Sequence, residues 1–431
     1  MAGLIGLFIG LVALGLPIAF ALGAAGIVGL MLLDGVPLAI VASRIFGGVD
    51  SFTLLAIPFF ILAGELMENG GVSTRLVALA RALVGHVRGG LGNVTVGGMM
   101  LFSGISGSAT SDAAAVGSVM IPPMVKNGYS PERAGAIVAA AAGMGILVPP
   151  SLTMIVYGSM TNVSIGALFA AGFLPAFLLA AALMLHLRFE AIRLNLPTER
   201  RATWREFFIA LRGSSWALLI PTIIFVGILG GIFTPTEAAV VAAVAALLVG
   251  RYAYREVGWA DVWRIMVRTG LVSGAVMLMI AAANVFAWVI TIKQVPHMLA
   301  AAIQSVGAGP WLFLLLSFVV FLVLFALLEG LPAMLMVIPV FVPVAQQLGI
   351  DLLHYGIVMT LITGIALFLP PFGVGLYIVL SLSGSTVGQI SRCLFPYLLT
   401  MLAMSLVITL FPWLVYIVPS LLGLYAMPGS P

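Results

Sequence analysis

A run of small and hydroxyl-bearing residues between positions 103 and 117 offers the clearest chemistry in this sequence. It begins Ser103-Gly-Ile-Ser-Gly-Ser-Ala-Thr-Ser-Asp112. Glycines loosen a helical backbone, and hydroxyls need polar partners that hydrocarbon does not supply. At membrane depth, irregular polar backbone is tolerated only inside protein or beside a wet cavity, where ion and substrate sites form. The run therefore predicts a transport site, with Ser106, Gly107 and Ser108 as sodium ligands.

Four acidic residues have simpler possible roles. Asp112, the only charged residue of the run, either caps a helix or tunes the ion site. Glu65 and Glu68 end an apolar stretch, and we expect both to be solvated near the surface. Glu237, in Thr234-Pro-Thr-Glu-Ala, fits the first turn of a helix.

Two double prolines interrupt apolar segments and add backbone ligands. A proline has no amide hydrogen, so the carbonyl four residues earlier loses its helical partner. Unpaired carbonyls suit a hard cation such as Na⁺, although a kink repaired by neighbouring helices is the simpler alternative for one motif alone. The predicted sodium ligands at the double prolines are Gly145, Ile146, Pro149 and Pro150 in the first half, and Ala366, Leu367, Pro370 and Pro371 in the second. Gly330 is added from the break of the second apolar hairpin segment at Glu329-Gly330.

The placement of positive charge limits how an anionic cargo could be held. Three long stretches lack Lys and Arg: 134–187, 269–292 and 294–391. A carboxylate there would be held by hydroxyls, by the positive ends of half-helices and by bound cations. We therefore expect Ser151, Thr153 and the helix start at Gly373 to contact substrate.

Enzyme motifs are absent from the sequence. It contains no Walker A loop for ATP hydrolysis and no His-Glu-x-x-His motif, and its four histidines lack metal-ligand spacing. The surroundings of Ser106 match a nucleophile elbow only loosely. We expect no enzyme, no cofactor and no metal other than sodium, with transport driven by an ion gradient.

The composition places these residues in a membrane. Of 431 residues, 62% are hydrophobic and 7% are charged, and the mean hydropathy is +1.24. Too little polar surface remains for a water-soluble protein. Nucleic acid is not an expected partner, because the arginines lie in short loops between the apolar stretches. Apolar stretches of spanning length are 3–33, 52–68, 133–156, 164–187, 214–232, 236–250, 270–292, 354–380 and 394–424. The sequence predicts an all-α polytopic membrane protein.

Two further apolar segments, 91–125 and 311–345, are broken in the middle. The positive-inside rule places four basic clusters on the cytoplasmic face: 75–88, 126–133, 188–212 and 251–268. Since 91–125 begins and ends beside such clusters, it should enter and leave on one side, as a re-entrant helical hairpin. We expect 189–212 to be a cytoplasmic amphipathic linker.

An internal repeat divides the chain. A shift of 221 positions aligns Pro149-Pro150 with Pro370-Pro371 and Gly143 with Gly364. Five crossings between the hairpins make the second enter from the opposite face, so inverted-topology repeats of a secondary transporter are predicted. The parts are a first half 1–188 with hairpin 91–125 and interrupted helix 133–156, the linker 189–212, and a second half 213–431 with hairpin 311–345 and interrupted helix 354–380.

At these residues the chain resembles the large membrane subunit of TRAP transporters, the tripartite ATP-independent periplasmic family for organic acids. The resemblance covers essentially the whole chain. One departure is Ser111, which stands where the family ordinarily has alanine. The matching stretches are Phe102–Gly117, Ile121–Tyr129, Gly145–Ser151, Thr234–Ala238 and Leu369–Gly373.

The resemblance implies an elevator mechanism, in which a mobile domain with both hairpins moves through a fixed scaffold. It also implies sodium-coupled uptake of a C4-dicarboxylate, sialic acid or another carboxylate across a bacterial or archaeal cytoplasmic (inner) membrane. The implied partners, besides the lipid bilayer, are a small four-helix membrane subunit and a periplasmic substrate-binding protein.

Two alternatives remain open. One is a one-component sodium-coupled anion symporter of similar inverted-repeat fold, which would need neither partner. The other is a non-transporting membrane scaffold, which explains the apolar content but not the paired interruptions.

Overall fold

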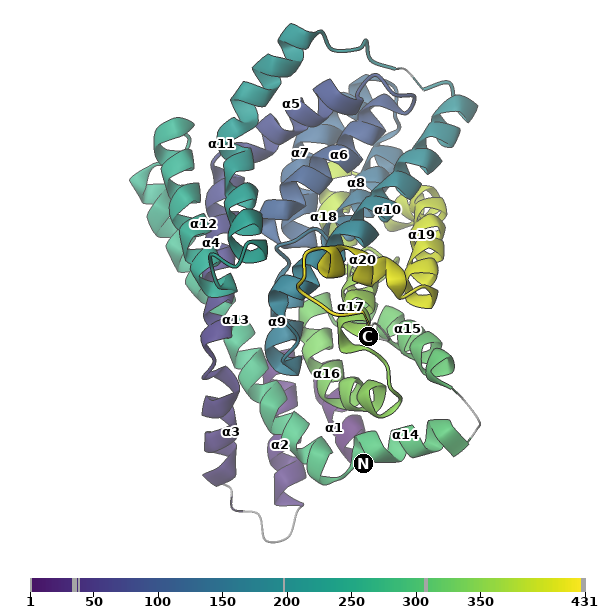
Figure 1. The fold of residues 1–431 in the computed structure, drawn as a ribbon. Coiled ribbons are helices and arrows are strands. Elements are labelled where there is room, and N and C mark those ends of the chain that lie inside the picture. The colour runs from purple at the N-terminus through teal and green to yellow at the C-terminus, as the bar shows by residue number, and fades with distance from the viewer. Residues whose placement is uncertain (1, 33–36, 38, 197, 306–308, 428–431) are drawn as a thin grey trace.

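The computed structural model describes residues 2–32, 37, 39–196, 198–305 and 309–427, and these form helices joined by turns and loops (Figure 1). The α-helices are α1 (Ala2–Ala13), α2 (Ile18–Met31), α3 (Ala39–Val49), α4 (Ala56–Asn69), α5 (Val72–Val84), α6 (Gly90–Ser106), α7 (Ala109–Lys126), α8 (Pro131–Gly145), α9 (Leu152–Thr161), α10 (Ile165–Arg193), α11 (Trp204–Leu229), α12 (Pro235–Leu248), α13 (Trp259–Ile292), α14 (Val295–Ser305), α15 (Pro310–Leu327), α16 (Gly330–Gln347), α17 (Leu352–Ala366), α18 (Val374–Ser383), α19 (Val387–Leu410) and α20 (Trp413–Leu421).

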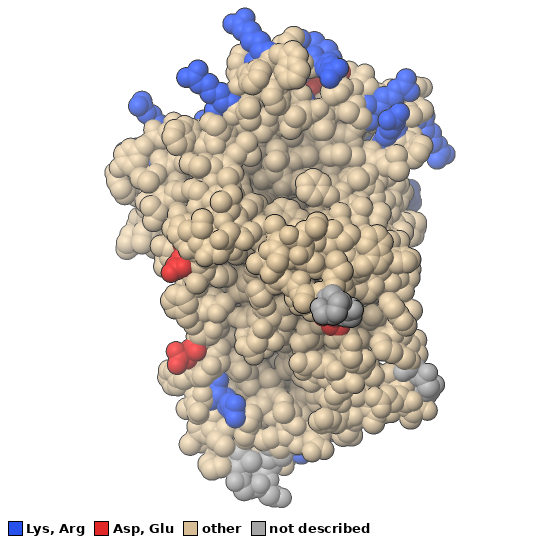
Figure 2. All heavy atoms as spheres, in the orientation of Figure 1, with Lys and Arg blue, Asp and Glu red and all other residues tan. Residues whose placement is uncertain are grey.

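Within the described residues, eight helical segments are long and apolar enough to cross a membrane. They are Phe52–Asn69, Ile165–Arg193, Trp204–Leu229, Pro235–Ala253, Trp259–Ile292, Pro310–Leu327, Gly330–Gln347 and Val387–Leu410. The prediction of an all-α, multi-pass membrane protein is confirmed. Lys and Arg side chains gather at the upper end of the molecule in Figure 2, which the positive-inside rule assigns to the cytoplasm.

Several predicted boundaries differ from the structure. The stretch 3–33 contains two helices, because Gly15 has a left-handed φ of 87° and Pro17 precedes α2. The stretch 394–424 is likewise divided, with Pro412 preceding α20. Three short helices, α3, α5 and α14, of 11, 13 and 11 residues, were not predicted because they are shorter than a membrane span.

The linker expected over 189–212 is shared between two long helices. α10 continues to Arg193, and α11 begins at Trp204. Thr203 and Glu206 form a reciprocal capping box at that start, which fixes where α11 begins. The same arrangement of Thr234 and Glu237 begins α12, which confirms the role predicted for Glu237.

Both hairpin segments are divided where the sequence predicted a break. In the first hairpin, α6 and α7, the break falls at Gly107, whose φ is 64°, and Ser108. In the second hairpin, α15 and α16, it falls at Leu328 and Glu329. The two arms of each hairpin pack against each other.

Both helices with a double proline are interrupted there. α8 and α9 are separated by residues 146–151, and α17 and α18 by residues 367–373. The bonds Pro149-Pro150 and Pro370-Pro371 are both cis. In Figure 1, α9 lies below α8 whereas α18 lies above α17, so the two interrupted helices run in opposite directions.

The offset of 221 positions relates whole helices. α7 and α16 begin at Ala109 and Gly330, and α8 and α17 end at Gly145 and Ala366, both pairs being 221 positions apart. In chain order, α5 to α10 correspond to α14 to α19. The repeat seen in the sequence is therefore a repeat of structure.

Candidate functional site

The tip of the first hairpin, residues 106–111, is organised around Asp112. This carboxylate is fully buried in the first turn of α7 and accepts hydrogen bonds from the hydroxyls of Ser103 and Ser106 on α6. It therefore joins the two arms across the break. The capping role considered for Asp112 is wrong, because its oxygens are bonded to the other helix.

The double-proline loop of the first half packs against this tip. At the end of α8, a side chain on Gly145 would collide with the hydroxyl of Ser103 and lie 3.1 Å from Oδ2 of Asp112. At the start of α9, the amide of Leu152 donates to the carbonyl of Gly107 at 3.4 Å. The structure thus brings Gly145, Pro149 and Pro150 against the hairpin residues that include Ser106, Gly107 and Ser108, and Ile146 follows Gly145 in the same loop.

The second half repeats this arrangement with different side chains. Gly330, the first residue of α16, packs against Thr363 and Leu367 at the end of α17. The predicted ligands Ala366, Leu367, Pro370 and Pro371 continue along the same helix end and loop. The contact between Gly330 and Leu367 brings this loop to the tip of the second hairpin.

The expectation of unpaired carbonyls is wrong for three of the four positions. The prolines remove helical donors, but each loop folds back into a turn and supplies an amide from further along the chain. The amide of Val148 donates to the carbonyl of Gly145 at 2.8 Å. In the second half, the amide of Leu369 donates to the carbonyl of Ala366 at 3.1 Å, and that of Gly375 to the carbonyl of Leu367 at 2.9 Å. A carbonyl oxygen has two lone pairs, so a bonded carbonyl still has room for a cation.

The residues predicted to bind substrate are engaged with protein partners. Ser151 and Thr153 are buried, and their hydroxyl oxygens lie 2.7 Å apart in a mutual hydrogen bond. Gly373 precedes α18, and its amide donates to the carbonyl of Leu369 at 2.9 Å. Substrate contact at these three residues remains a prediction.

A polar cavity of about 270 Å³ lies beside the tip of the first hairpin. One wall is formed by α4 and α13, and the other by the tip together with α9 and α18. Its polar lining residues are Glu65, Glu68, Ser106, Ser108, Thr110, Ser111 and Arg268. The hydroxyl-rich run is therefore open to a polar cavity on this side.

The sequence did not predict the charged wall of this cavity. Arg268 on α13 pairs with Glu65 on α4, with 3.1 Å between Nε and Oε1, and Glu65 is only 12% exposed. Glu68 accepts a hydrogen bond from Ser111 at 2.5 Å. The expectation of a solvated side chain is wrong for Glu65, which is largely buried against α13. Glu68 is partly exposed at the cavity and is bonded to the hairpin through Ser111.

The length of α13 explains why Arg268 lines the cavity. α13 has 34 residues and is about 51 Å long, which exceeds the roughly 30 Å thickness of the hydrocarbon core. A basic residue ten positions inside such a helix need not lie in a surface loop. In the sequence, Arg268 falls in the basic cluster 251–268 because the apolar stretch begins two residues later.

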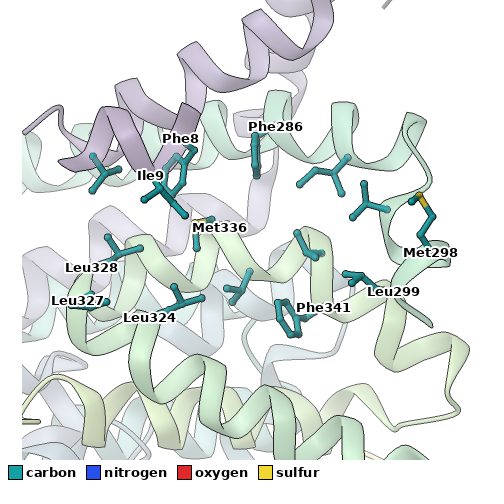
Figure 3. A pocket seen from close by; sticks show the side chains of 15 residues that line it. Phe8, Ile9, Phe286, Met298, Leu299, Leu324, Leu327, Leu328, Met336 and Phe341 are labelled. Carbon is teal, nitrogen blue, oxygen red and sulfur yellow. The ribbon is translucent and has the colours of Figure 1, made fainter. Parts of the chain in front are cut away.

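A second cavity, of about 500 Å³, lies between α1, α13, α14 and the second hairpin (Figure 3). All of its lining side chains are apolar, among them Phe8, Phe286, Met336 and Phe341. Such side chains offer neither a charge nor a hydrogen-bond donor to a carboxylate. The polar cavity is the candidate site because two of the predicted sodium ligands, Ser106 and Ser108, line it.

Comparison with known proteins identifies the family. The profile of the family described as the tripartite ATP-independent periplasmic transporter, DctM component, matches residues 5–414. The C4-dicarboxylate TRAP transporter large permease protein DctM of Pseudomonas aeruginosa is 38% identical over 404 residues, covering 94% of this chain and 95% of that protein. The 2,3-diketo-L-gulonate TRAP transporter large permease protein YiaN of Escherichia coli is 37% identical over 411 residues, covering 95% and 97%.

The fold also resembles a solved transporter structure. The YdaH transporter of Alcanivorax borkumensis matches with a TM-score of 0.66 and 16% sequence identity, covering 89% of this chain and 91% of that one. At this identity the match shows the fold alone. The relatives are named as permease subunits, which confirms the prediction of a transporter component and not an enzyme. The chain belongs to the DctM family, the large permease subunits of tripartite ATP-independent periplasmic transporters.

Proposed function

We propose that this permease uses a sodium gradient to carry an organic acid across the cytoplasmic membrane. The observation that carries the proposal is the environment of Asp112. Its carboxylate is fully buried and bonded to two serine hydroxyls, and none of the ion pairs among the described residues includes it. A buried carboxylate without a counter-charge is costly, and Na⁺ bound beside it supplies that charge.

The ligands for such an ion lie next to Asp112. Ser103 and Ser106 have hydroxyl oxygens already directed at its carboxylate, and Gly145 brings backbone against the same group. Carboxylate, hydroxyl and carbonyl oxygens are the ligands that hard cations prefer. We assign a second ion to the equivalent group around Gly330, where carbonyls take the place of the acid.

The proposal includes inverted repeats and elevator-type movement of one body. α18 packs against α7 and α8, and α9 packs against α16 and α17, so both hairpins and both interrupted helices interlock. The polar cavity lies where this body meets α4 and α13. A boundary lined by polar groups is a suitable surface for such a body to slide along.

The partners and cargo follow from the family. Its description as tripartite supports a small membrane subunit and a periplasmic substrate-binding protein that delivers the cargo. The named relatives carry a C4-dicarboxylate and a keto sugar acid, both organic acids. We assign the same broad class of cargo to this chain, and place it in the cytoplasmic membrane.

Uptake by proteoliposomes tests the proposal. The chain is reconstituted with its small subunit, the binding protein is supplied outside with labelled acid, and Na⁺ is replaced by choline at constant pH. We expect uptake to stop. Unchanged uptake in choline would contradict sodium coupling, whereas uptake by the chain without either partner would favour a one-component symporter. A lack of uptake under every gradient would favour a scaffold.

A further inference from the structure

We propose that the polar cavity beside the first hairpin is the cargo site and that it takes a small hydroxylated monocarboxylate. Arg268 binds the carboxylate, and Glu65 accepts a hydrogen bond from a cargo hydroxyl. The inference rests on the proposed function, because it names the cargo of that transport site.

Arg268 is prepared to bind an anion. A guanidinium has five N–H donors in a planar fork that matches a carboxylate. Only Nε is engaged, with Oε1 of Glu65 at 3.1 Å, and the side chain is 65% exposed. The terminal N–H groups have no partner among the described residues. They are placed to donate two parallel hydrogen bonds to a carboxylate in the cavity.

One carboxylate oxygen of Glu65 has no hydrogen-bond donor in the described protein, and a cargo hydroxyl can provide one. Its Oε1 is paired with Arg268, but Oε2 is buried and has no hydrogen-bond partner within the described part of the chain. Buried oxygen atoms without a donor are uncommon in folded proteins. A hydroxyl group on a bound molecule supplies the donor while its carboxylate lies against the guanidinium.

The opposite wall adds adaptable hydrogen-bonding groups. The hydroxyls of Ser108 and Thr110 lie 3.1 Å apart and bond each other, so either can turn to a bound molecule. Ser111 donates to Glu68, which leaves its own oxygen free to accept. The wall thus suits a molecule that both donates and accepts several hydrogen bonds.

The balance of charge disfavours a second carboxylate. The lining contains one guanidinium and two glutamates, and no other cationic side chain lines the cavity in the described structure. A dicarboxylate that placed one end on Arg268 would direct the other toward Glu65 or Glu68, and like charges at this range repel. The volume of about 270 Å³ lies just below the common range for ligand pockets, so the acid is small.

Protection of a cysteine in the cavity tests the assignment without relying on transport. Cys393 is replaced by serine, and Ala114, which lines the cavity, becomes the reporter as Ala114→Cys. The permease, purified with its small subunit in Na⁺, is alkylated by a water-soluble maleimide, and the label on the large subunit is measured. The probes are D-gluconate, succinate, butanoate and D-glucose at equal concentration.

We expect D-gluconate to slow alkylation several-fold and the other three probes to have little effect. Succinate adds a repelled charge, butanoate has no hydroxyl, and glucose has no carboxylate. Protection by succinate equal to that by gluconate, or protection by none of the four, would overturn the assignment.

Variants locate the two contacts. Arg268→Gln removes protection by gluconate, and Glu65→Gln raises the half-protecting concentration about tenfold, the loss expected for a hydrogen bond to a charged group. Arg264→Gln is the matched control, because Arg264 lies on the same helix, pairs with Asp261 and does not line the cavity.

A folding defect is separated from a binding defect. Arg268→Lys keeps the charge, so we expect it to elute as folded protein in size-exclusion chromatography. Because lysine lacks the planar fork of N–H donors, we expect weaker protection by gluconate. Full protection in Arg268→Lys and Arg268→Gln would remove the role of Arg268. If sodium-dependent uptake persists while gluconate fails to protect, the cargo assignment is wrong and the proposed function stands.

Discussion

Gly143 and Gly364 lie against each other where α8 crosses α17. A Cβ atom on Gly143 would be 2.8 Å from the carbonyl oxygen of Gly364, and a Cβ on Gly364 would collide with the carbonyl oxygen of Gly143. The two residues occupy equivalent positions in the repeats. Mutual contact of equivalent residues is expected where a two-fold axis relates two units, so this contact supports the proposed inversion of the repeats.

Gly364→Ala should therefore destabilise the protein. The added methyl group meets backbone that cannot rotate away, and overpacking of this kind costs about 1–3 kcal/mol. We expect a lower apparent Tm for the purified permease in detergent. Gly274→Ala is the control, because nothing lies within 4 Å of that Cβ position on α13. Equal Tm values for both variants would contradict the close contact.

Inversion of the repeats predicts labelling from opposite faces. Lys126 ends α7 and Gln347 ends α16, 221 positions apart and both exposed. In the Cys393→Ser background, an impermeant thiol reagent should label Lys126→Cys only from the cytoplasm and Gln347→Cys only from outside. Labelling of both from one face would instead indicate parallel repeats.

Removal of the Ser106 hydroxyl and removal of the Ser108 hydroxyl should have different effects on the apparent affinity for Na⁺. Ser106 donates to Asp112, whereas the hydroxyl of Ser108 bonds that of Thr110. Ser106→Ala should raise the half-saturating Na⁺ concentration for uptake about fivefold, which corresponds to about 1 kcal/mol for a net hydrogen bond. Ser108→Ala should change it less. A larger effect of Ser108→Ala than of Ser106→Ala would indicate that the ion does not bind at Asp112.

Movement of the hairpin against α4 predicts that joining them stops uptake. Ser111 on α7 donates to Glu68 on α4 across the proposed boundary. A short bifunctional maleimide that joins Glu68→Cys to Ser111→Cys, in the Cys393→Ser background, should abolish uptake. Joining Asp261→Cys to Arg264→Cys within α13 is the control and should not. Full uptake after cross-linking of the first pair would argue against movement at this boundary.

Local features made the interruptions predictable. Gly107 and the two double prolines break helices for reasons contained in their own backbone chemistry. The offset of 221 positions then predicts a boundary in one half from its equivalent in the other. Ala109 and Gly330, which are 221 positions apart, both begin helices. Where Gly15 and Pro17 lay inside an apolar run, hydropathy alone hid the break between α1 and α2.

The site depended on contacts that no local pattern contains. Ser103 reaches Asp112 only because the chain reverses at Gly107. Glu65 and Arg268 are 203 positions apart and meet because α4 packs against α13. The loop carbonyls differ from the expectation for a local reason, because turns within each loop supply donors that a count of helical partners omits.

Binding of sodium to the buried acid is the central claim, and Asp112→Asn tests it most directly. The amide keeps the size of the side chain but removes the charge that the cation balances. Equilibrium binding of radioactive Na⁺ to the purified permease should show saturable binding in the unmodified protein. In Asp112→Asn, at least one ion per chain should be lost while the protein still elutes as a folded complex. The same number of ions bound with the same affinity in both proteins would contradict the account.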